Sequence, residues 1–192
     1  MRLVILGPPG SGKGTQAELL SKKLRVPAIS VGELLRNEVS NGTEDGRVAQ
    51  GYMERGEWVP HDITFRVLRK RLEEKDAKDG FILDAFPRLS AEYHQLGSYL
   101  VKKGENLDAV ISLKVSDIEC IRRIQVRAEV QASKGVYRPD TSEEVTLNRL
   151  RNHHETSAPI LKYYEDSGLL IEIDGNGPIG MVHKEILKKL GK

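Results

Sequence analysis

A glycine-rich stretch near the start of the chain has the residue types and spacing that bind nucleotide phosphates. It reads GPPGSGKGTQ and runs from Gly7 to Gln16. It fits the pattern G-x-x-x-x-G-K-[ST], except that Gly14 stands at the Ser/Thr position and a hydroxyl follows one place later at Thr15. Glycines let backbone N–H groups converge on phosphate oxygens, and Lys13 adds a positive charge for the outer phosphates. The stretch therefore predicts a phosphate-binding loop.

The order of strand-like and helix-like segments predicts the fold that positions this loop. Short aliphatic runs typical of buried strands lie at residues 2–6, 26–29, 81–86, 109–113 and 169–174. Between them, apolar residues recur at helical spacing over residues 11–24, 62–75, 90–103, 117–130 and 142–165. Such alternation favours a parallel sheet covered on both faces. We therefore predict an α/β fold, a P-loop three-layer α/β/α domain with a five-stranded parallel sheet.

Two stretches interrupt this alternation. Residues 30–59 are mostly helical and contain turn signals but no strand-like run. Residues 128–139 form a short polar excursion between two long helices. Ligands of doubly wound sheets bind at the carboxyl ends of the strands, where such insertions can close over them. We interpret both stretches as mobile flaps of a single domain.

The bulk composition excludes several classes of protein. The 192 residues have room for one core, and a net charge of +2 with 5% aromatic residues is low for a nucleic-acid binder. The single cysteine, Cys120, excludes an internal disulfide and a cysteine-rich zinc site, and we expect it to be packed. The apolar runs are too short for a signal peptide or a membrane span. We therefore expect a cytoplasmic protein that binds neither nucleic acid nor membrane.

Five ordered motifs extend the phosphate loop into a family pattern. They are ISVGELLRNEV from residue 29, RGEWVP from residue 55, GFILDAFPR from residue 80, YRPDTSEEVTLNRL from residue 137 and DGNGPI from residue 174. With the G-K-G-T form of the loop, they resemble the adenylate kinase family over essentially the whole chain. The resemblance implies a nucleoside-monophosphate kinase that transfers a phosphoryl group reversibly from Mg·ATP to AMP, giving two ADP.

The resemblance also implies how the domain is divided. The core comprises residues 1–29, 60–127 and 139–192, a helical NMP-binding insertion comprises residues 30–59, and a short lid comprises residues 128–138. Some relatives have longer lids that carry four zinc ligands, but this lid has neither the length nor the cysteines. We therefore expect Mg²⁺ as the cofactor and no zinc.

The residue types fit the chemistry of such a transfer. The attacking group is a phosphate oxygen that is already ionised, so the task is charge neutralisation and in-line positioning. This predicts many arginines, because guanidinium groups bind phosphate bidentately and stay charged. Six arginines match the family positions that grip phosphate or stack on adenine: Arg36, Arg88, Arg123, Arg127, Arg138 and Arg149. We expect Arg36 and Arg88 on the acceptor phosphate and the other four around the transferring phosphoryl group and donor base.

The resemblance assigns the remaining contacts residue by residue. It places ATP against Gly10, Ser11, Gly12, Lys13, Gly14, Thr15, Arg123, Arg127 and Gly177. It places AMP against Val31, Arg36, Glu57, Trp58, Val59, Ala85, Arg88, Glu92, Arg138 and Arg149. The catalytic set is Lys13, Arg88, Arg123, Arg138 and Arg149. Mg²⁺ is expected on Thr15 and Asp84, commonly through water, and the alternative for Asp84 is a helix cap.

Three departures from the family pattern lie where the acceptor base would bind. Val31 replaces a usual threonine, Ala85 a usual glycine and Glu92 a usual glutamine. An ionised glutamate has only acceptors, so it would repel adenine N1 and suit guanine better. We therefore hypothesise relaxed selection of the acceptor base, with Gln95, one helical turn on, supplying an amide from the same face. The alternative is that Glu92 faces solvent.

Several alternatives stay open from the sequence. Trp58 either stacks on the acceptor base or packs the flap, and Thr141 beside Asp140 predicts a less firmly held lid. Adjacent His153 and His154 are expected to have surface or packing roles. A kinase that prefers GMP, UMP or CMP is the rival within the class, whereas a regulatory nucleotide switch and a nucleic-acid-dependent ATPase lack supporting features. The family default is a monomer, although some archaeal relatives are trimers.

Overall fold

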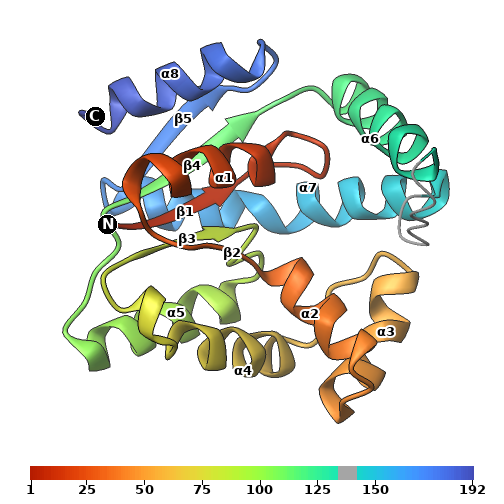
Figure 1. The fold of residues 1–192 in the computed structure, drawn as a ribbon, viewed down its shortest axis with the longest axis horizontal. Coiled ribbons are helices and arrows are strands. Elements are labelled where there is room, and N and C mark those ends of the chain that lie inside the picture. The colour runs from red at the N-terminus through yellow and green to blue at the C-terminus, as the bar shows by residue number, and fades with distance from the viewer. Residues whose placement is uncertain (134–141) are drawn as a thin grey trace.

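Five parallel strands form the middle layer of the protein (Figure 1). The structure, a computed structural model, describes residues 1–133 and 142–192. The strands lie in the order β2-β3-β1-β4-β5. They are β1 (Arg2–Leu6), β2 (Ala28–Ser30), β3 (Phe81–Asp84), β4 (Ala109–Lys114) and β5 (Leu170–Asp174), and every neighbouring pair is parallel. The predicted α/β class and five-stranded parallel sheet are therefore confirmed.

Helices connect the strands and cover both faces of the sheet (Figure 1). They are α1 (Lys13–Leu24), α2 (Val31–Ser40), α3 (Glu44–Glu54), α4 (His61–Leu72), α5 (Ser90–Lys103), α6 (Asp117–Ala132), α7 (Glu143–Asp166) and α8 (Ile179–Lys189), with a short 3-10 helix, η1 (Lys75–Ala77). Helix α8 was not predicted from the sequence. Within the described residues, no helix is both long enough and apolar enough to cross a lipid bilayer.

The core has two halves, one on each face of the sheet. Along β1, Leu3 and Ile5 face a cluster that α1 and α8 complete, whereas Val4 and Leu6 face a cluster that α2, α3, α4, α5 and α7 complete. Side chains of a strand alternate between its two faces, and here both faces are buried. This explains why the strands read as nearly continuous aliphatic runs.

Two element boundaries differ from the predicted ones because of local backbone geometry. The strand predicted at 81–86 ends at Asp84, since the next residue, Ala85, has a φ of 59° and turns the chain out of the sheet. The first helix begins only at Lys13, because Gly12 before it has a left-handed φ of 92°. Both corrections fall at the carboxyl ends of strands, where the functional residues are.

The two predicted flaps differ in how much of them the structure describes. Residues 30–59 form α2, α3 and the loop that follows, and the two helices project beyond the edge of the sheet (Figure 1). Helix α3 is capped by Thr43, whose side chain accepts a hydrogen bond from the Gly46 N–H. Of the predicted lid, residues 128–132 belong to α6. The lid residue Arg138 and the neighbouring Asp140 and Thr141 lie outside the described residues.

The turn after β3 is built on an alanine in an unfavourable conformation. Ala85 donates its N–H to the Ile5 carbonyl at 3.0 Å, which ties the turn to β1. The Phe86–Pro87 peptide bond that follows is cis. A left-handed φ costs a non-glycine residue about 1–2 kcal/mol, because Cβ crowds the backbone. Glycine would adopt the same φ without that crowding.

We therefore expect Ala85→Gly to stabilise the protein by about 0.5–1 kcal/mol, since the relief at φ 59° exceeds the added entropy of an unfolded glycine. Urea unfolding would measure the change. The matched control is Ala91→Gly in α5, where a helical glycine should cost about 1 kcal/mol. Equal destabilisation by both substitutions would contradict the account of the turn.

Candidate active site

One large cavity opens at the carboxyl ends of the strands. Its volume is about 1280 Å³, whereas pockets for single small ligands usually measure about 300–1000 Å³. The loop between β1 and α1 lines its floor, together with the ends of β3 and β4 and the turn between β5 and α8. Helices α2, α6 and α7 supply the walls. The cavity therefore has room for two ligands side by side.

The glycine-rich loop is held open by close backbone contacts. Gly10 and Gly12 have left-handed φ values of 84° and 92°. A Cβ on Gly10 would lie 2.4 Å from the carbonyl oxygen of Cys120 in α6, so only glycine fits there. The Ser11 N–H donates to the Pro8 carbonyl at 3.1 Å, which closes the turn. Cys120 is fully buried, so its predicted packing role is confirmed.

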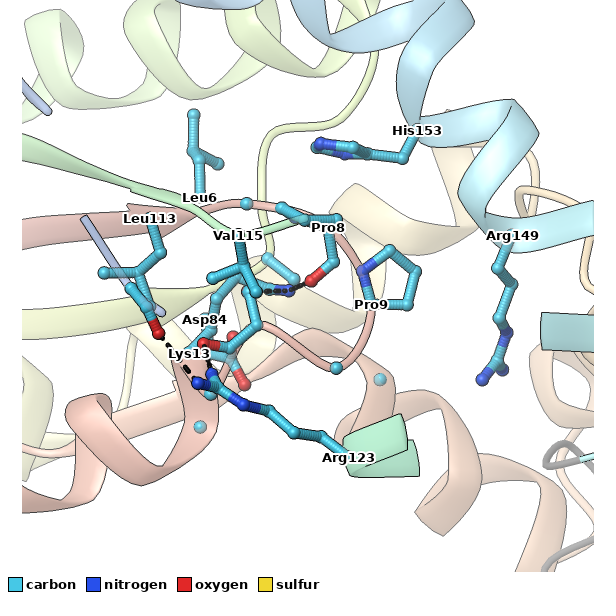
Figure 2. Close-up of a pocket in the computed structure, with 18 of the residues that line it drawn as sticks. Leu6, Pro8, Pro9, Lys13, Asp84, Leu113, Val115, Arg123, Arg149 and His153 are labelled. Carbon is cyan, nitrogen blue, oxygen red and sulfur yellow. Dashed lines mark hydrogen bonds between the residues drawn. The ribbon is translucent and has the colours of Figure 1, made fainter. Parts of the chain in front are cut away.

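Lys13 and Asp84 lie together at the centre of the cavity (Figure 2). The Lys13 ammonium donates to the Pro8 carbonyl at 2.8 Å. Burial lowers the Lys13 pKa to about 8, the nearby Asp84 opposes this shift, and Arg88 and Arg127 add to it. Burial also raises the pKa of Asp84, although the Lys13 and Arg88 charges oppose that rise. The two groups thus attract each other electrostatically within a cluster of cations.

The carboxylate of Asp84 has an unused acceptor. Its Oδ1 is buried and has no hydrogen-bond partner among the described residues. A Cβ placed on Gly14 would lie 3.4 Å from its Oδ2, so glycine at this position leaves room for the carboxylate beside the loop. The hydroxyl-bearing residue, Thr15, is exposed and also lines the cavity. A hard cation bound by oxygen atoms, directly or through water, fits this set of donors.

Three arginines of the predicted acceptor side line the same cavity: Arg36 from α2, Arg88 after β3 and Arg149 from α7. The Arg88 Nε–H donates to the Ala85 carbonyl at 2.6 Å. The carbon at the centre of its guanidinium lies 4.8 Å from the ring centroid of Trp58. Burial and the charges of Arg149 and Arg36 lower the pKa of Arg88. The arrangement concentrates positive charge on one side of the cavity.

Arg123 links the glycine-rich loop to the turn after β5 (Figure 2). Its Nη1 donates to the Ser11 carbonyl at 3.2 Å and its Nη2 to the Gly175 carbonyl at 2.9 Å. Its Nε donates to Glu119 at 2.7 Å. Because β5 and β3 lie on opposite sides of β1, Arg123 lies on the other side of the loop from Arg88.

Most of the residues assigned from the sequence line this one cavity. They are Gly10, Ser11, Gly12, Lys13, Gly14, Thr15, Arg36, Glu57, Trp58, Val59, Asp84, Ala85, Arg88, Arg123, Arg127, Arg149 and Gly177. Arg138 lies outside the described residues. Val31 and Glu92 are buried and do not line the cavity.

The position of Glu92 corrects two expectations. It is only 2% exposed, so the solvent-facing alternative is wrong. Its Oε2 accepts hydrogen bonds from the backbone N–H groups of Arg88 at 2.7 Å and Leu89 at 3.3 Å. The carboxylate thus caps the first turn of α5 instead of facing an acceptor base, because the two N–H groups there have no helical partner. The argument for a guanine preference at this position is thereby removed.

Gln95 does not supply the missing amide to the cavity. Its Nε2 donates to Asp62 at 3.2 Å and lies 3.2 Å from the His61 ring nitrogen. It lines a separate shallow pocket between α4 and α5, with Phe65 and Tyr99. The spacing of one helical turn from Glu92 was a poor guide, because Glu92 itself points toward the N-terminus of α5.

Sequence reasoning missed several cavity residues, among them three with ionisable side chains that bear on the site. Glu33 lies within the quoted motif GELLR, and Glu119 holds Arg123 from one helical turn earlier. His153 lines the cavity from α7, four residues after Arg149 (Figure 2). That helical spacing was a usable signal, since residues four apart lie on the same face. Burial lowers the pKa of His153 to about 4, and the nearby Lys13 charge adds to this effect.

The fold and the cavity together define a class of enzyme. A parallel sheet with a glycine-rich loop at its carboxyl edge, and one large cavity lined by several arginines, is the arrangement of a nucleoside-monophosphate kinase. The chain belongs to the adenylate kinase family. The family's model, described as "Adenylate kinase", matches residues 5–169.

Curated relatives support the same assignment over the full length. A protein named adenylate kinase from Thermobifida fusca is 45% identical over 190 residues, which cover 99% of this chain and 98% of the relative. One from Mycolicibacterium paratuberculosis is 42% identical over 192 residues, with both chains fully covered. One from Methanococcoides burtonii is 36% identical over 211 residues, which cover 99% of this chain and 98% of the relative. The predicted family membership is confirmed.

The half-buried His153 predicts a pH dependence of stability. An unfolded histidine titrates near 6.5 and the folded one near 4, so the unfolded state takes up its proton first as the pH falls. This contribution is complete above pH 6.5 and declines toward pH 4, with a loss of about 2 kcal/mol between pH 7 and pH 5. Urea unfolding at both pH values should show that His153→Gln loses less stability than the wild type, whereas the exposed-site control His94→Gln should match the wild type. An unchanged pH slope in His153→Gln would show the assignment to be wrong.

Proposed function

We propose that this chain transfers the terminal phosphoryl group of Mg·ATP to AMP, giving two ADP, and also catalyses the reverse reaction. The observation that supports this most directly is the convergence of Lys13, Arg36, Arg88, Arg123, Arg127 and Arg149 on one cavity large enough for two nucleotides. Membership of the adenylate kinase family supports ATP and AMP as the pair. A preference for GMP, UMP or CMP is not favoured, because the relatives reported above are named adenylate kinase.

On the donor side, the loop would hold the phosphates of ATP. The backbone N–H groups of Gly10 to Thr15 and the N-terminus of α1 favour negative charge, and Lys13 would bridge the outer phosphates. Arg123 lies between the loop and the turn at Gly175, so it would cover the donor base. Gly177 lies in the same part of the cavity lining.

On the acceptor side, Arg36 and Arg88 would hold the phosphate of AMP. Glu57, Trp58 and Val59 form the adjoining wall, and Ala85 and Val31 lie at its base, with Val31 behind the surface. Arg127 and Arg149 would then neutralise the phosphoryl group in flight, and Arg138 is assigned the same role by the family pattern. The attacking phosphate oxygen is already ionised, so no general base is required.

Mg²⁺ would sit between Thr15 and Asp84. The buried, unpartnered Oδ1 of Asp84 and the exposed hydroxyl of Thr15 are oxygen donors of the kind that Mg²⁺ accepts directly or through water. When bound to ATP, the ion supplies charge neutralisation at the phosphates. Within the described residues, no cluster of three His, Cys, Asp or Glu side chains could hold a metal ion alone. This fits an ion that arrives with its nucleotide.

Free nucleotides are the proposed partners, with neither nucleic acid nor membrane involved. We infer the cytoplasm as the compartment because the one cysteine, Cys120, is free, as is usual in a reducing environment. The proposed state is a monomer, which the family resemblance implies as the default.

Lys13→Met should lower ADP formation from ATP and AMP at least about a hundredfold, because it removes a preorganised charge from the transition state. Initial rates of ADP production would measure the loss. Lys22→Met, an exposed change in the last turn of α1, is the matched control and should keep the wild-type rate. Full activity of the Lys13 variant would rule out the proposed reaction site.

Asp84→Asn should raise the Mg²⁺ concentration needed for half-maximal activity at least about tenfold, since an amide oxygen carries no net charge for the cation. A Mg²⁺ titration at fixed ATP and AMP would measure the shift. Asp79→Asn, an exposed change before β3, is the control. An unchanged Mg²⁺ requirement in Asp84→Asn would remove Asp84 from the metal site.

A further inference from the structure

The loop between β3 and α5 holds Arg88 through its own backbone. The Ala85 carbonyl accepts from the Arg88 Nε–H at 2.6 Å, which fixes the plane of the guanidinium. That carbonyl is itself placed by the left-handed φ of Ala85, 59°. The two Nη groups are the other hydrogen-bond donors of the guanidinium, and a phosphate would bind to them. The orientation of Arg88 therefore depends on how firmly this short loop is held.

Glu92 holds the same loop from the side of α5. Its Oε2 accepts from the N–H groups of Arg88 and Leu89, at 2.7 and 3.3 Å. Glu92 is 2% exposed, so these hydrogen bonds form away from water, where they are costly to lose. Burial raises the pKa of the Glu92 carboxyl, and the Arg88 charge and the two N–H groups oppose that rise. The Glu92 charge also acts on Arg88 directly, since it is the largest of the attractive influences that raise the pKa of that guanidinium.

Trp58 supports Arg88 from the flap. The guanidinium carbon lies 4.8 Å from the indole ring centroid, within the range of a cation–π contact. Trp58 comes from the loop between α3 and α4, so the contact joins the flap to the β3–α5 loop. Arg36 and Arg149 repel Arg88, as their effect on its pKa shows. Without the ring and the carboxylate, this repulsion would favour other orientations of Arg88.

We propose that Glu92 and Trp58 are positioning residues that hold Arg88 in its phosphate-binding orientation before the monophosphate arrives. This inference rests on the proposed function and assigns Glu92 a role that differs from reading the acceptor base. Glu92 acts on the backbone that carries Arg88, and Trp58 acts on the face of its guanidinium. The ligand feature that both residues influence is the phosphate, which all nucleoside monophosphates share.

The two halves of AMP separate this role from a base contact. Ribose 5-phosphate carries the phosphate without a base, and adenosine carries the base without a phosphate. We expect Glu92→Ala to weaken competitive inhibition by ribose 5-phosphate against AMP at least about tenfold, and to leave inhibition by adenosine within about twofold. The KM for ATP should also stay within about twofold. The opposite pattern, in which inhibition by adenosine is weakened and inhibition by ribose 5-phosphate is unchanged, would overturn the proposal.

Two further variants guard against a general loss of structure. Glu92→Gln keeps an oxygen that can accept hydrogen bonds from the two N–H groups. Compared with Glu92→Ala, it should therefore recover at least half of the lost affinity for ribose 5-phosphate, on a logarithmic scale. Thr43→Ala removes a comparable helix cap from α3, outside the cavity lining, and should leave both inhibition constants unchanged. Equal effects of Glu92→Ala and Thr43→Ala would reduce Glu92 to a purely structural role and overturn the proposal.

The role of Trp58 has a matched control in the same flap. Trp58→Leu should weaken competitive inhibition by ribose 5-phosphate about fivefold. Trp58→Phe keeps a ring and should weaken this inhibition by less. Tyr52→Leu removes a similar ring, which lies 5.2 Å from Arg55 and outside the cavity lining, and should have no effect. Trp58 is the only tryptophan, so its fluorescence emission should shift in Glu92→Ala and not in Thr43→Ala. An unshifted emission in Glu92→Ala would show that Arg88 had not moved, against the proposal.

Failure of this inference and failure of the proposed function are distinguishable. If Lys13→Met abolishes ADP formation while Glu92→Ala leaves ribose 5-phosphate inhibition unchanged, the kinase assignment stands and the positioning role is wrong. If Lys13→Met leaves ADP formation intact, the reaction site itself is wrong, whatever the Glu92 variants show.

Discussion

The gathering of like charges in one partly buried cavity is the constraint on which the rest of the structure depends. Lys13 and Arg88 are cations whose pKa values are lowered first by burial, and their cationic neighbours lower them further. Such a cluster is unfavourable by itself, because like charges repel more strongly where water is excluded. The fold must therefore supply the rigidity that keeps the cluster together.

The sheet and three carboxylates supply that rigidity in different ways. The carboxyl ends of β1, β3 and β4 fix the loops that carry the cations, since neighbouring parallel strands end at one edge. Asp84 lies beside Lys13, Glu119 accepts from Arg123, and Glu92 accepts from the backbone of Arg88. Each of these three carboxylates lies close to a cavity cation or to its loop, and these contacts help to hold the cations in place.

The sequence predicted the sheet because buried strands are local signals, and the resemblance to the family supplied the set of cations. Gly10 indicates that another backbone segment packs closely against this position. An arginine in a motif indicates a positive charge at that position, whatever its tertiary surroundings. The role of Glu92 was mispredicted because its position three residues after Leu89 does not match a capping box, which begins with Ser or Thr. His153 was missed because its burial depends on elements far away in the sequence.

The turn at Ala85 shows how the same constraint reaches into the backbone. A left-handed alanine is retained only where the surrounding structure determines it, and here its N–H is tied to β1 and its carbonyl to the Arg88 side chain. The strained residue, Ala85, therefore lies between the sheet and Arg88. A small rotation of its backbone would redirect the Arg88 guanidinium. Glu92 and Trp58 act on the same arginine from α5 and from the flap. Because these contacts come from separate elements, Arg88 is oriented by the tertiary fold as a whole rather than by its own helix or strand.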